Sequence, residues 1–403
     1  MCRKVKGYTN LGWTTEKGET EPEYSAGDTV KITKATQFYA VRRKSNYYTV
    51  SYYLGNGSTN AAYQKLTQTV EEGTVVTFAK VPARTGYVNQ GWSSKKNSEK
   101  ATAKAKCTVN KNITLYAVQK KAVQLTFHRC DGSTWQKTTL AKGSSYSLPG
   151  VRDAEGYTFM GWSTKPMQSV SPQYEAEEKI TVNGNVDLYA VVFNRTTETD
   201  LTEDQLPQVD IYKYKQVIFV GDSRTEFMEN VLTGMGESAT KNVKFVCSAG
   251  KGLDWFTTTG WAQLYSIVQH DSNSILSKKT AVIFNFGVND LSKSADYAEY
   301  YNWIAPQLKS KGCELYFMSV NPVNRLMLPN AGRADRSEAA VRSFNQYMKA
   351  NLSSAYTYID MYSYLKSTGY SFASDHYGTG TVDDGLHYTT RTYKRFLQNV
   401  WIH

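Results

Sequence analysis

Three copies of one sequence pattern constrain the first half of this 403-residue chain more than any other feature. Each copy contains the phrase Gly-Tyr-x-x-x-Gly-Trp and then, 24 to 27 residues after its tryptophan, the tyrosine of an apolar-Tyr-Ala-Val phrase. The first phrase starts at Gly7, Gly86 and Gly156, and the second ends at Val41, Val118 and Val191. A spacing that recurs three times indicates tandem copies of one small structural module.

The segments around these phrases have the pattern of short strands. Thr29–Thr33 and Lys179–Val182 alternate apolar and polar residues and are flanked by turn residues, which predicts half-buried strands. Strand-like stretches at Tyr48–Tyr53 and Val123–Phe127 also precede the second and third copies, whereas the first copy lacks one, so we expect the natural protein to be longer at its N-terminus. The β-rich modules are expected at residues 1–44 (partial), 45–120 and 121–195.

These phrases resemble the Listeria-Bacteroides repeat, also called the internalin-type B repeat, over residues 2 to about 195. The resemblance implies β-grasp-like modules in tandem on an exported bacterial surface protein, with a spacer or adhesive role. It assigns no binding residue. The repeated tryptophans Trp13, Trp92 and Trp162 could stack on sugars, but in so small a module the core is their expected place.

The pattern changes after the third copy. Residues 196–212 are polar with little periodicity and are interpreted as a linker. From residue 213 to residue 403 short apolar runs alternate with helical periodicity, which predicts an α/β domain with a parallel sheet. The expected strands are Val217–Val220, Val243–Val246, Ala281–Phe286, Glu314–Val320 and Tyr356–Ile359, and the expected helices include Asp296–Ser310, Ser337–Leu352 and Thr389–Trp401.

Short polar motifs follow the expected strands, where parallel sheets place their sites. Gly221–Arg224 (Gly-Asp-Ser-Arg) follows the first strand, Gly250–Gly252 the second and Gly287–Asp290 the third, and Asp384–His387 precedes the last helix. Each motif alone is common in unrelated chains. Their order and placement within about 165 residues point to one site.

This constellation resembles the SGNH hydrolases, also called the GDSL esterase and lipase family, over residues 214–403. The resemblance implies a three-layer α/β/α, flavodoxin-like domain. It places the nucleophile on Ser223, the acid and base on Asp384 and His387, and the oxyanion hole on Gly252, Asn289 and the backbone N–H of Ser223. Arg224 stands where the family usually has leucine, and the second motif is less typical, so Gly250 remains a rival to Gly252.

The residues support this chemistry without the family. A serine hydroxyl is a weak nucleophile until a neighbouring base removes its proton, and His387 is the expected base, with Asp384 fixing its tautomer. His376 is the rival base. Backbone N–H groups and an asparagine amide can stabilise the oxyanion that forms on the attacked carbonyl.

Three further residues are candidate substrate contacts. Arg224 could grip a carboxylate or a sugar hydroxyl, or it could equally tie down a loop. Trp255 follows the glycine motif and could line an acyl or sugar pocket, although core packing is slightly favoured. Asn321 ends the fourth expected strand and should face the same rim.

Composition limits the partners and the cofactors. Residues 1–200 carry 27 basic and 17 acidic side chains and residues 201–403 carry 20 and 19, so +10 of the net +11 charge lies in the first half. This charge favours an anionic wall or surface polymer, and a merely solvated surface is the alternative. No nucleic-acid-binding motif is present. Five widely spaced cysteines without a Cys-x-x-Cys pair predict neither a disulfide framework nor a metal site, and no cofactor is implied.

The hypotheses about function follow from the two halves together. No run approaches the roughly 20 apolar residues of a membrane-spanning helix, and no signal sequence is recognisable in this chain, so the surface-type repeats carry the expectation of an extracellular or cell-surface location. The leading hypothesis is a serine esterase that removes small acyl groups, with acetyl expected, from carbohydrate. The alternatives are a lipase or lysophospholipase, an acyltransferase, and a surface adhesin with an inactive hydrolase-like domain. The acyl group, the sugar, the role of the repeats and the oligomeric state are not fixed by the sequence.

Overall fold

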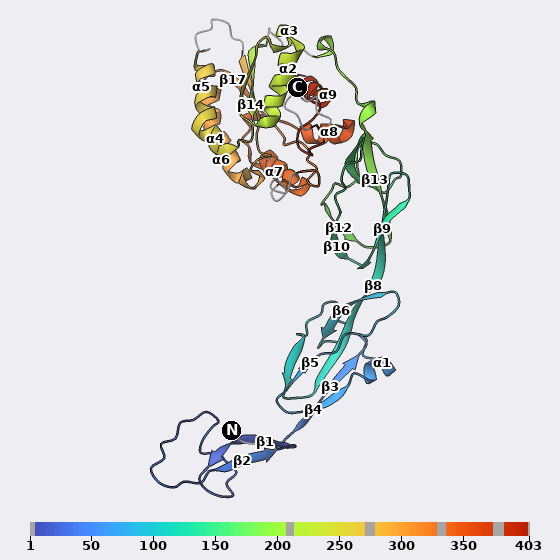
Figure 1. Cartoon of the computed structure of the whole chain (residues 1–403), viewed down its shortest axis with the longest axis vertical. Helices are drawn as coiled ribbons and strands as arrows, with labels where there is room; N and C mark the ends of the chain where they lie inside the picture. Colours follow the sequence, from blue (N-terminus) through green and yellow to red (C-terminus); the bar gives the residue numbers. More distant parts are fainter. Residues whose placement is uncertain (1–4, 207–212, 271–278, 329–335, 374–382, 402–403) are drawn as a thin grey trace. The chain divides into compact units, whose positions relative to one another are not determined.

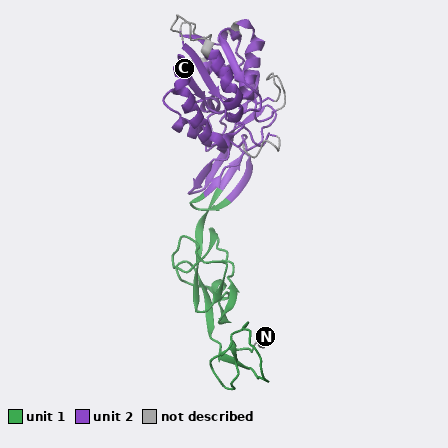
Figure 2. Ribbon diagram, turned by 90° about the vertical axis from the view of Figure 1, so that its left-hand side faces the viewer, with its two compact units in different colours: residues 1–124, 139–144 green, residues 125–138, 145–403 purple. Residues whose placement is uncertain are grey.

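The computed structural model describes residues 5–206, 213–270, 279–328, 336–373 and 383–401 (Figure 1). The chain divides into two compact units (Figure 2). Unit 1 comprises Met1–Gln124 and Thr139–Ser144, and unit 2 comprises Leu125–Thr138 and Ser145–His403. Unit 2 therefore joins the third repeat to the α/β domain.

Unit 1 consists of short strands and one helical turn. Its elements are β1 (Tyr8–Thr14), β2 (Tyr39–Lys44), β3 (Tyr47–Tyr53), α1 (Ala61–Gln64), β4 (Gln68–Glu71), β5 (Thr74–Thr77), β6 (Tyr87–Ser93) and β7 (Lys106–Val109). Two strands, β8 (Ile113–His128) and β9 (Thr134–Ala141), continue across the boundary between the units. The expected strand at Thr29–Thr33 is not formed.

The two repeated phrases pair with each other in the same register in every copy. The Gly-Trp strand lies antiparallel to the Tyr-Ala-Val strand, with each tryptophan opposite the alanine, at Trp13 and Ala40, Trp92 and Ala117, and Trp162 and Ala190. A bulge precedes each tryptophan. The bulge requires glycine: Gly161 has a φ of +143°, and a Cβ there would lie 2.5 Å from the carbonyl oxygen of Tyr174. The repeated glycine is therefore a structural requirement of the module.

The tryptophan belongs to the core of its module in the second and third repeats, whereas Trp13 of the first repeat is half-buried. Trp92 and Trp162 are 6% and 0% exposed. Each indole N–H donates to a backbone carbonyl thirteen residues earlier, Ala79 at 2.6 Å and Pro149 at 2.8 Å. These two rings are thus unavailable for stacking on a sugar.

The first part of unit 2 completes the third repeat. It adds β10 (Ser144–Ser147), β11 (Tyr157–Ser163), β12 (Lys179–Val182) and β13 (Val186–Asn194), followed by the 3₁₀ turns η1 (Arg195–Thr197) and η2 (Glu203–Gln205). The last residues of β8 pair in parallel with β13, from Leu125 opposite Val186 to His128 opposite Tyr189.

The second part of unit 2 is a five-stranded parallel sheet with helices. The strands are β14 (Tyr214–Gly221), β15 (Val243–Cys247), β16 (Lys279–Asn285), β17 (Cys313–Met318) and β18 (Tyr356–Ile359), in the order β15-β14-β16-β17-β18. The helices are α2 (Ser223–Met235), α3 (Glu237–Thr240), α4 (Leu253–Trp255), the π-helical turn η3 (Phe256–Gly260), α5 (Trp261–His270), η5 (Leu291–Lys293), α6 (Ser294–Lys309), α7 (Glu338–Asn351), α8 (Met361–Thr368) and α9 (Thr390–Trp401). The predicted α/β class is confirmed.

Alternate residues of each strand belong to two separate hydrophobic clusters. On β14, Ile218 and Val220 pack with α5, α6 and α7, whereas Val217 and Phe219 pack with α2, α8 and α9. Figure 1 shows these helix groups on different sides of the sheet. From β14 the chain passes to β15 on one side, and from β15 it crosses over β14 to β16 on the other side. The strand order therefore reverses between β14 and β16. In doubly wound sheets this reversal opens a crevice at the carboxyl ends of the strands.

The segment interpreted as a linker is partly packed into this domain. Leu201 and Leu206 are 7% and 5% exposed and belong to the α2, α8 and α9 cluster, together with Phe193 of the third repeat. Glu198 is buried and accepts a hydrogen bond from Arg395 of α9 at 2.6 Å. The linker interpretation is therefore wrong for this part. Its buried apolar residues are isolated among polar ones, so they show no periodic pattern in the sequence.

Among the described residues, no helix is both long and apolar enough to cross a membrane.

Candidate active site

Ser223 begins the helix that follows the first strand of the sheet. Asp222 caps this helix, and its carboxylate accepts the backbone N–H of Arg224 at 3.0 Å. The residues before the cap are the apolar end of β14, so the turn brings Ser223 to the edge where the strand order reverses. Ser223 is 6% exposed.

The structure brings Ser223, His387 and Asp384 together. The Ser223 Oγ lies 2.9 Å from His387 Nε2, and His387 Nδ1 lies 2.6 Å from Asp384 Oδ2. The other carboxylate oxygen of Asp384 accepts the backbone N–H groups of Leu386 and His387, both at 2.8 Å. With Nδ1–H donated to the carboxylate, Nε2 is the acceptor that a serine hydroxyl requires.

An aromatic ring that the sequence motifs do not include orients the imidazole. Phe227 stacks on His387 with ring centroids 4.5 Å apart and planes 9° from parallel. Phe227 lies one helical turn after Ser223 on α2, so one helix carries both the Ser223 hydroxyl and the ring against which His387 packs. The spacing of four residues was the available sequence signal.

Arg224 ties loops together. It is 2% exposed, and its guanidinium donates to the carbonyl oxygens of Leu386 at 3.0 Å, Asn321 at 3.0 Å and Pro322 at 2.9 Å. It also lies over the ring of Tyr388, 5.1 Å from the centroid. Since Leu386 directly precedes His387, the residue beside Ser223 holds the segment that carries His387.

The pKa of the carboxyl group beside Ser223, that of Asp222, is strongly raised. Burial raises the pKa of Asp222 to about 6, although the charge of Arg224 opposes this rise. Asp222 is 1% exposed and its cap bond to Arg224 is internal to the turn. It is thus a second acidic group near His387, distinct from Asp384.

The two expected oxyanion-hole loops are linked to each other. Asn289 donates its side-chain N–H to the carbonyl oxygen of Lys251 at 2.8 Å, and its Oδ1 accepts from Arg336 at 2.6 Å. The Asp290 carboxylate accepts the backbone N–H of Leu253 at 2.9 Å. Since an amide nitrogen has two hydrogens, one N–H of Asn289 remains for a ligand. Arg336, which fixes the amide orientation, carried no sequence signal.

The two rival glycines differ in their surroundings. A Cβ on Gly252 would lie 2.3 Å from Asp290 Oδ2, so the Gly252 backbone packs directly on the Asn289–Asp290 loop. Gly250 has a φ of +69° and nothing within 4 Å of a Cβ. The packing therefore favours Gly252 as the glycine that meets the asparagine loop.

Of the three remaining candidates, two are buried or half-buried and one lies outside the described residues. Asn321 is fully buried, and neither of its side-chain polar atoms has a hydrogen-bond partner among the described residues. Trp255 is half-buried and packs against Phe286, with ring centroids 6.0 Å apart. The rival base His376 lies outside the described residues.

Comparison with known proteins supports the interpretation of the repeats. Residues 48–118 and 124–191 match the family model of the Listeria-Bacteroides repeat domain. The chain is 28% identical over 186 residues, 46% of its length, to a protein of Evansella cellulosilytica provisionally named a Gly-rich membrane protein, and 25% identical over 186 residues to a second provisionally named membrane protein of that organism. The chain spans only 20% and 26% of the lengths of these relatives.

Solved structures similar to this chain include two with hydrolase names. One is provisionally named an SGNH hydrolase, from Slackia heliotrinireducens, with 13% identity and a TM-score of 0.33, covering 47% of this chain and 100% of that one. The other is provisionally named a GDSL-like lipase, from Parabacteroides merdae, with 12% identity and a TM-score of 0.28, covering 48% and 99%.

Proposed function

We propose that this chain is an extracellular or surface serine esterase of the SGNH type that removes small acyl groups, acetyl in particular, from carbohydrate. One observation carries the proposal: the unbroken chain of contacts from the Ser223 hydroxyl through His387 to Asp384. The strand order and the two clusters that flank the sheet support a three-layer α/β/α, flavodoxin-like arrangement for this domain, and the shared register of the repeats supports β-grasp-like modules.

The proposed reaction uses only residues of this chain. His387 Nε2 takes the proton of Ser223 as the Oγ attacks the ester carbonyl, and Asp384 stabilises the imidazolium that forms. The negative oxygen is stabilised by the backbone N–H groups of Ser223 and Gly252 and by the free N–H of Asn289. The alcohol leaves with the proton from His387, and water, activated by the same imidazole, releases the acid.

Labelling and acetate release test the proposal. The chain should release acetate from acetylated glycans, and a fluorophosphonate probe should label Ser223. Ser223→Ala should abolish labelling, His387→Ala should lower turnover by orders of magnitude, and Asn289→Ala should lower kcat about a hundredfold. If the chain neither releases acetate nor is labelled, the better account is a surface adhesin with an inactive hydrolase-like domain.

A chain-length series of p-nitrophenyl esters separates the acyl classes. Small-acyl activity predicts that kcat/KM is highest for acetate and falls with chain length. A maximum at long chains would favour the lipase or lysophospholipase alternative, and acyl transfer to an added sugar in preference to water would favour the acyltransferase.

A further inference from the structure

The loop that carries the acid and the base is held partly by the third repeat. Asp383, which precedes Asp384, accepts the backbone N–H of Gly385 at 2.8 Å with one carboxylate oxygen. Its other oxygen forms an ion pair with Arg195, the residue that follows β13 of the repeat. The repeat thus contacts the chain one residue before the acid of the proposed triad.

Arg195 is fixed on the repeat side by two further groups. Its Nη2 donates to Asp153 Oδ2 at 3.0 Å, and its Nε donates to Thr158 Oγ1 at 3.0 Å. The side chains of Asp153, Asp383 and Arg195 are 1%, 8% and 19% exposed. Burial, and then the neighbouring Asp383 carboxylate, raise the pKa of Asp153. One guanidinium therefore serves two nearly buried carboxyl groups, and the raised pKa of Asp153 means that this pair keeps a proton more readily than a free aspartate does.

A second connection supports the same loop. Asn324 donates its side-chain N–H to Asp153 Oδ1 at 2.8 Å and to the carbonyl oxygen of Val151 at 3.1 Å, both in the repeat. Its backbone N–H donates to the carbonyl oxygen of Gly385 at 2.8 Å. A Cβ on Gly385 would lie 2.4 Å from the Asn324 carbonyl oxygen, so the two segments are in close contact. Asp153 therefore reaches the acid-base loop by two routes.

We propose that the third repeat positions the active site. Arg195 acts as a positioning residue that holds Asp383 and thereby keeps Asp384 hydrogen-bonded to His387, and His387 within hydrogen-bond reach of Ser223. This inference rests on the proposed esterase function. Without Arg195, two buried carboxylates would face each other without a countercharge, which is strongly unfavourable. The loop would relieve this repulsion by moving, and a displacement of about 1 Å at a catalytic group can cost about a hundredfold in rate.

The test compares two arginines of the same repeat in the full chain. Arg195→Ala should lower kcat for a p-nitrophenyl ester by ten- to a hundredfold with little change in KM. Arg152→Ala is the matched control, because Arg152 also reaches across to the α/β domain, donating to the Leu326 carbonyl oxygen at 2.5 Å, without contacting Asp383. Arg195→Lys should restore part of the loss. Asp383→Asn should shrink the effect of Arg195→Ala, since one of the two repelling charges is then gone.

A spectroscopic readout separates this inference from the proposed function. The proton between His387 Nδ1 and Asp384 should give a low-field NMR signal that Arg195→Ala weakens or shifts and Arg152→Ala leaves in place. Equal activity and equal signals in the two variants would overturn the inference while leaving an active esterase. If the wild-type chain is inactive and unlabelled, the esterase proposal fails, and the NMR comparison still decides whether Arg195 positions His387.

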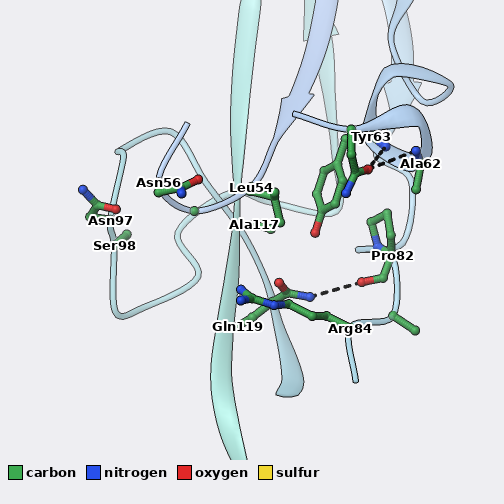
Figure 3. Close-up of a pocket in the computed structure, with 13 residues that line it drawn as sticks. Leu54, Asn56, Ala62, Tyr63, Pro82, Arg84, Asn97, Ser98, Ala117 and Gln119 are labelled. Atoms are coloured by element: carbon green, nitrogen blue, oxygen red, sulfur yellow. Dashed lines mark hydrogen bonds between the residues drawn. The ribbon is translucent and has the colours of Figure 1, made fainter. Parts of the chain in front are cut away.

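An independent observation in unit 1 indicates a binding pocket in the second repeat. Tyr63 of α1 is 3% exposed, and its ring packs edge-on against Trp92 with centroids 6.0 Å apart. Within the described part of the chain its hydroxyl has no hydrogen-bond partner, and it points into a pocket of about 530 Å³ (Figure 3). Burial raises the pKa of Tyr63, so the hydroxyl keeps its proton for donation.

The lining of this pocket favours an acidic sugar. Leu54, Pro82 and Ala117 form apolar walls, and Asn56 and Arg84 supply N–H groups. The described residues that line the pocket include no acidic side chain. Residues 45–120 carry ten basic and three acidic side chains, a net of +7. We infer that the pocket binds a uronic-acid segment of an acidic polysaccharide, whose carboxylate accepts from Tyr63 and Arg84 while the ring lies on the apolar walls.

Titration of the full chain with trigalacturonate tests this site, with neutral maltotriose as the comparison ligand. Tyr63→Phe keeps the ring and removes only the hydroxyl, so it should weaken trigalacturonate binding about tenfold. Tyr53→Phe is the matched control, because Tyr53 packs against Tyr116, with ring centroids 5.9 Å apart, and is not one of the residues that line the pocket. Binding should weaken with added salt. No binding of trigalacturonate, equal binding by both variants, or a preference for maltotriose would overturn the assignment.

Discussion

At the scale of single residues, Asp222 shows how the turn that carries Ser223 affects stability. Below about pH 4 the carboxyl group of Asp222 is protonated in both the folded and the unfolded chain, so its burial makes no pH-dependent contribution to the free energy of unfolding. Because burial raises its folded pKa to about 6, the unfolded chain releases the proton first as the pH rises. The folded state is then penalised increasingly up to about pH 6 and constantly above it, by roughly 3 kcal/mol at about 1.4 kcal/mol per pKa unit.

The variant Asp222→Asn should remove this dependence, since asparagine can still cap α2. Relative to the wild type, its unfolding free energy should increase between pH 4 and pH 7 and then level off, as measured by urea denaturation. Asp360→Asn is a suitable comparison because Asp360 caps α8 at an exposed position. A difference between Asp222→Asn and the wild type that is constant over this range would contradict the prediction.

At the same scale, the sequence predicted which residues meet but not what surrounds them. Ser223, Asp384 and His387 lie in short motifs at strand and helix ends, and local patterns of this kind place them at one edge of a parallel sheet. Phe227 and Arg336 are defined only by packing and by a hydrogen bond across the chain. Such partners leave no local pattern, because their role depends on the folded coordinates of another segment.

At the scale of elements, substitutions of the two glycines in the loop after β15 should have different effects. In Gly252→Ala the new methyl group meets the Asp290 carboxylate, so the loops that carry Gly252 and Asn289 must separate. We expect kcat for a small ester to fall at least tenfold, because oxyanion donors act only at short range. Gly250→Ala should cost about 1 kcal/mol of stability through its positive φ and leave kcat near that of the wild type. A larger loss of kcat in Gly250→Ala would make Gly250 the oxyanion glycine.

The strands were the most predictable elements. Buried parallel strands read as apolar runs, and the expected Tyr356–Ile359 coincides with β18 while the other four expected strands fall within three residues of β14 to β17 at each end. The expected strand in the first repeat is absent. Its alternation resembles that of Lys179–Val182, which forms β12 and pairs with β10. Alternation alone therefore predicts a strand only where a partner strand exists.

At the scale of the whole molecule, Lys366 joins the third repeat to the α/β domain. Its ammonium group, on an 8% exposed side chain, forms ion pairs with Glu175 and Glu338, each at 2.8 Å, and donates to the carbonyl oxygen of Met160 at 2.9 Å. Lys366→Met should destabilise unit 2 by roughly 3 to 5 kcal/mol, because it leaves two buried carboxylates without their cation. Urea denaturation measures this loss.

The matched control is Lys349→Met on α7. Lys349 is 64% exposed and 3.9 Å from Asp360, so its removal should change stability by less than about 1 kcal/mol. A small effect of Lys366→Met would mean that the repeat and the α/β domain unfold independently. The union of these two parts was not predictable from the sequence, because its contacts join residues such as Arg195 and Asp383 that are 188 positions apart.

The hydrophobic core that the third repeat shares with the α/β domain also affects how the protein is made. Met160, Val191 and Phe193 leave the ribosome before any strand of the sheet they cover. At about 5 to 20 residues per second, the 208 residues after Arg195 take on the order of 10 to 40 seconds to synthesise. During that interval the apolar face of the repeat is exposed in the nascent chain, where holdase chaperones can bind it.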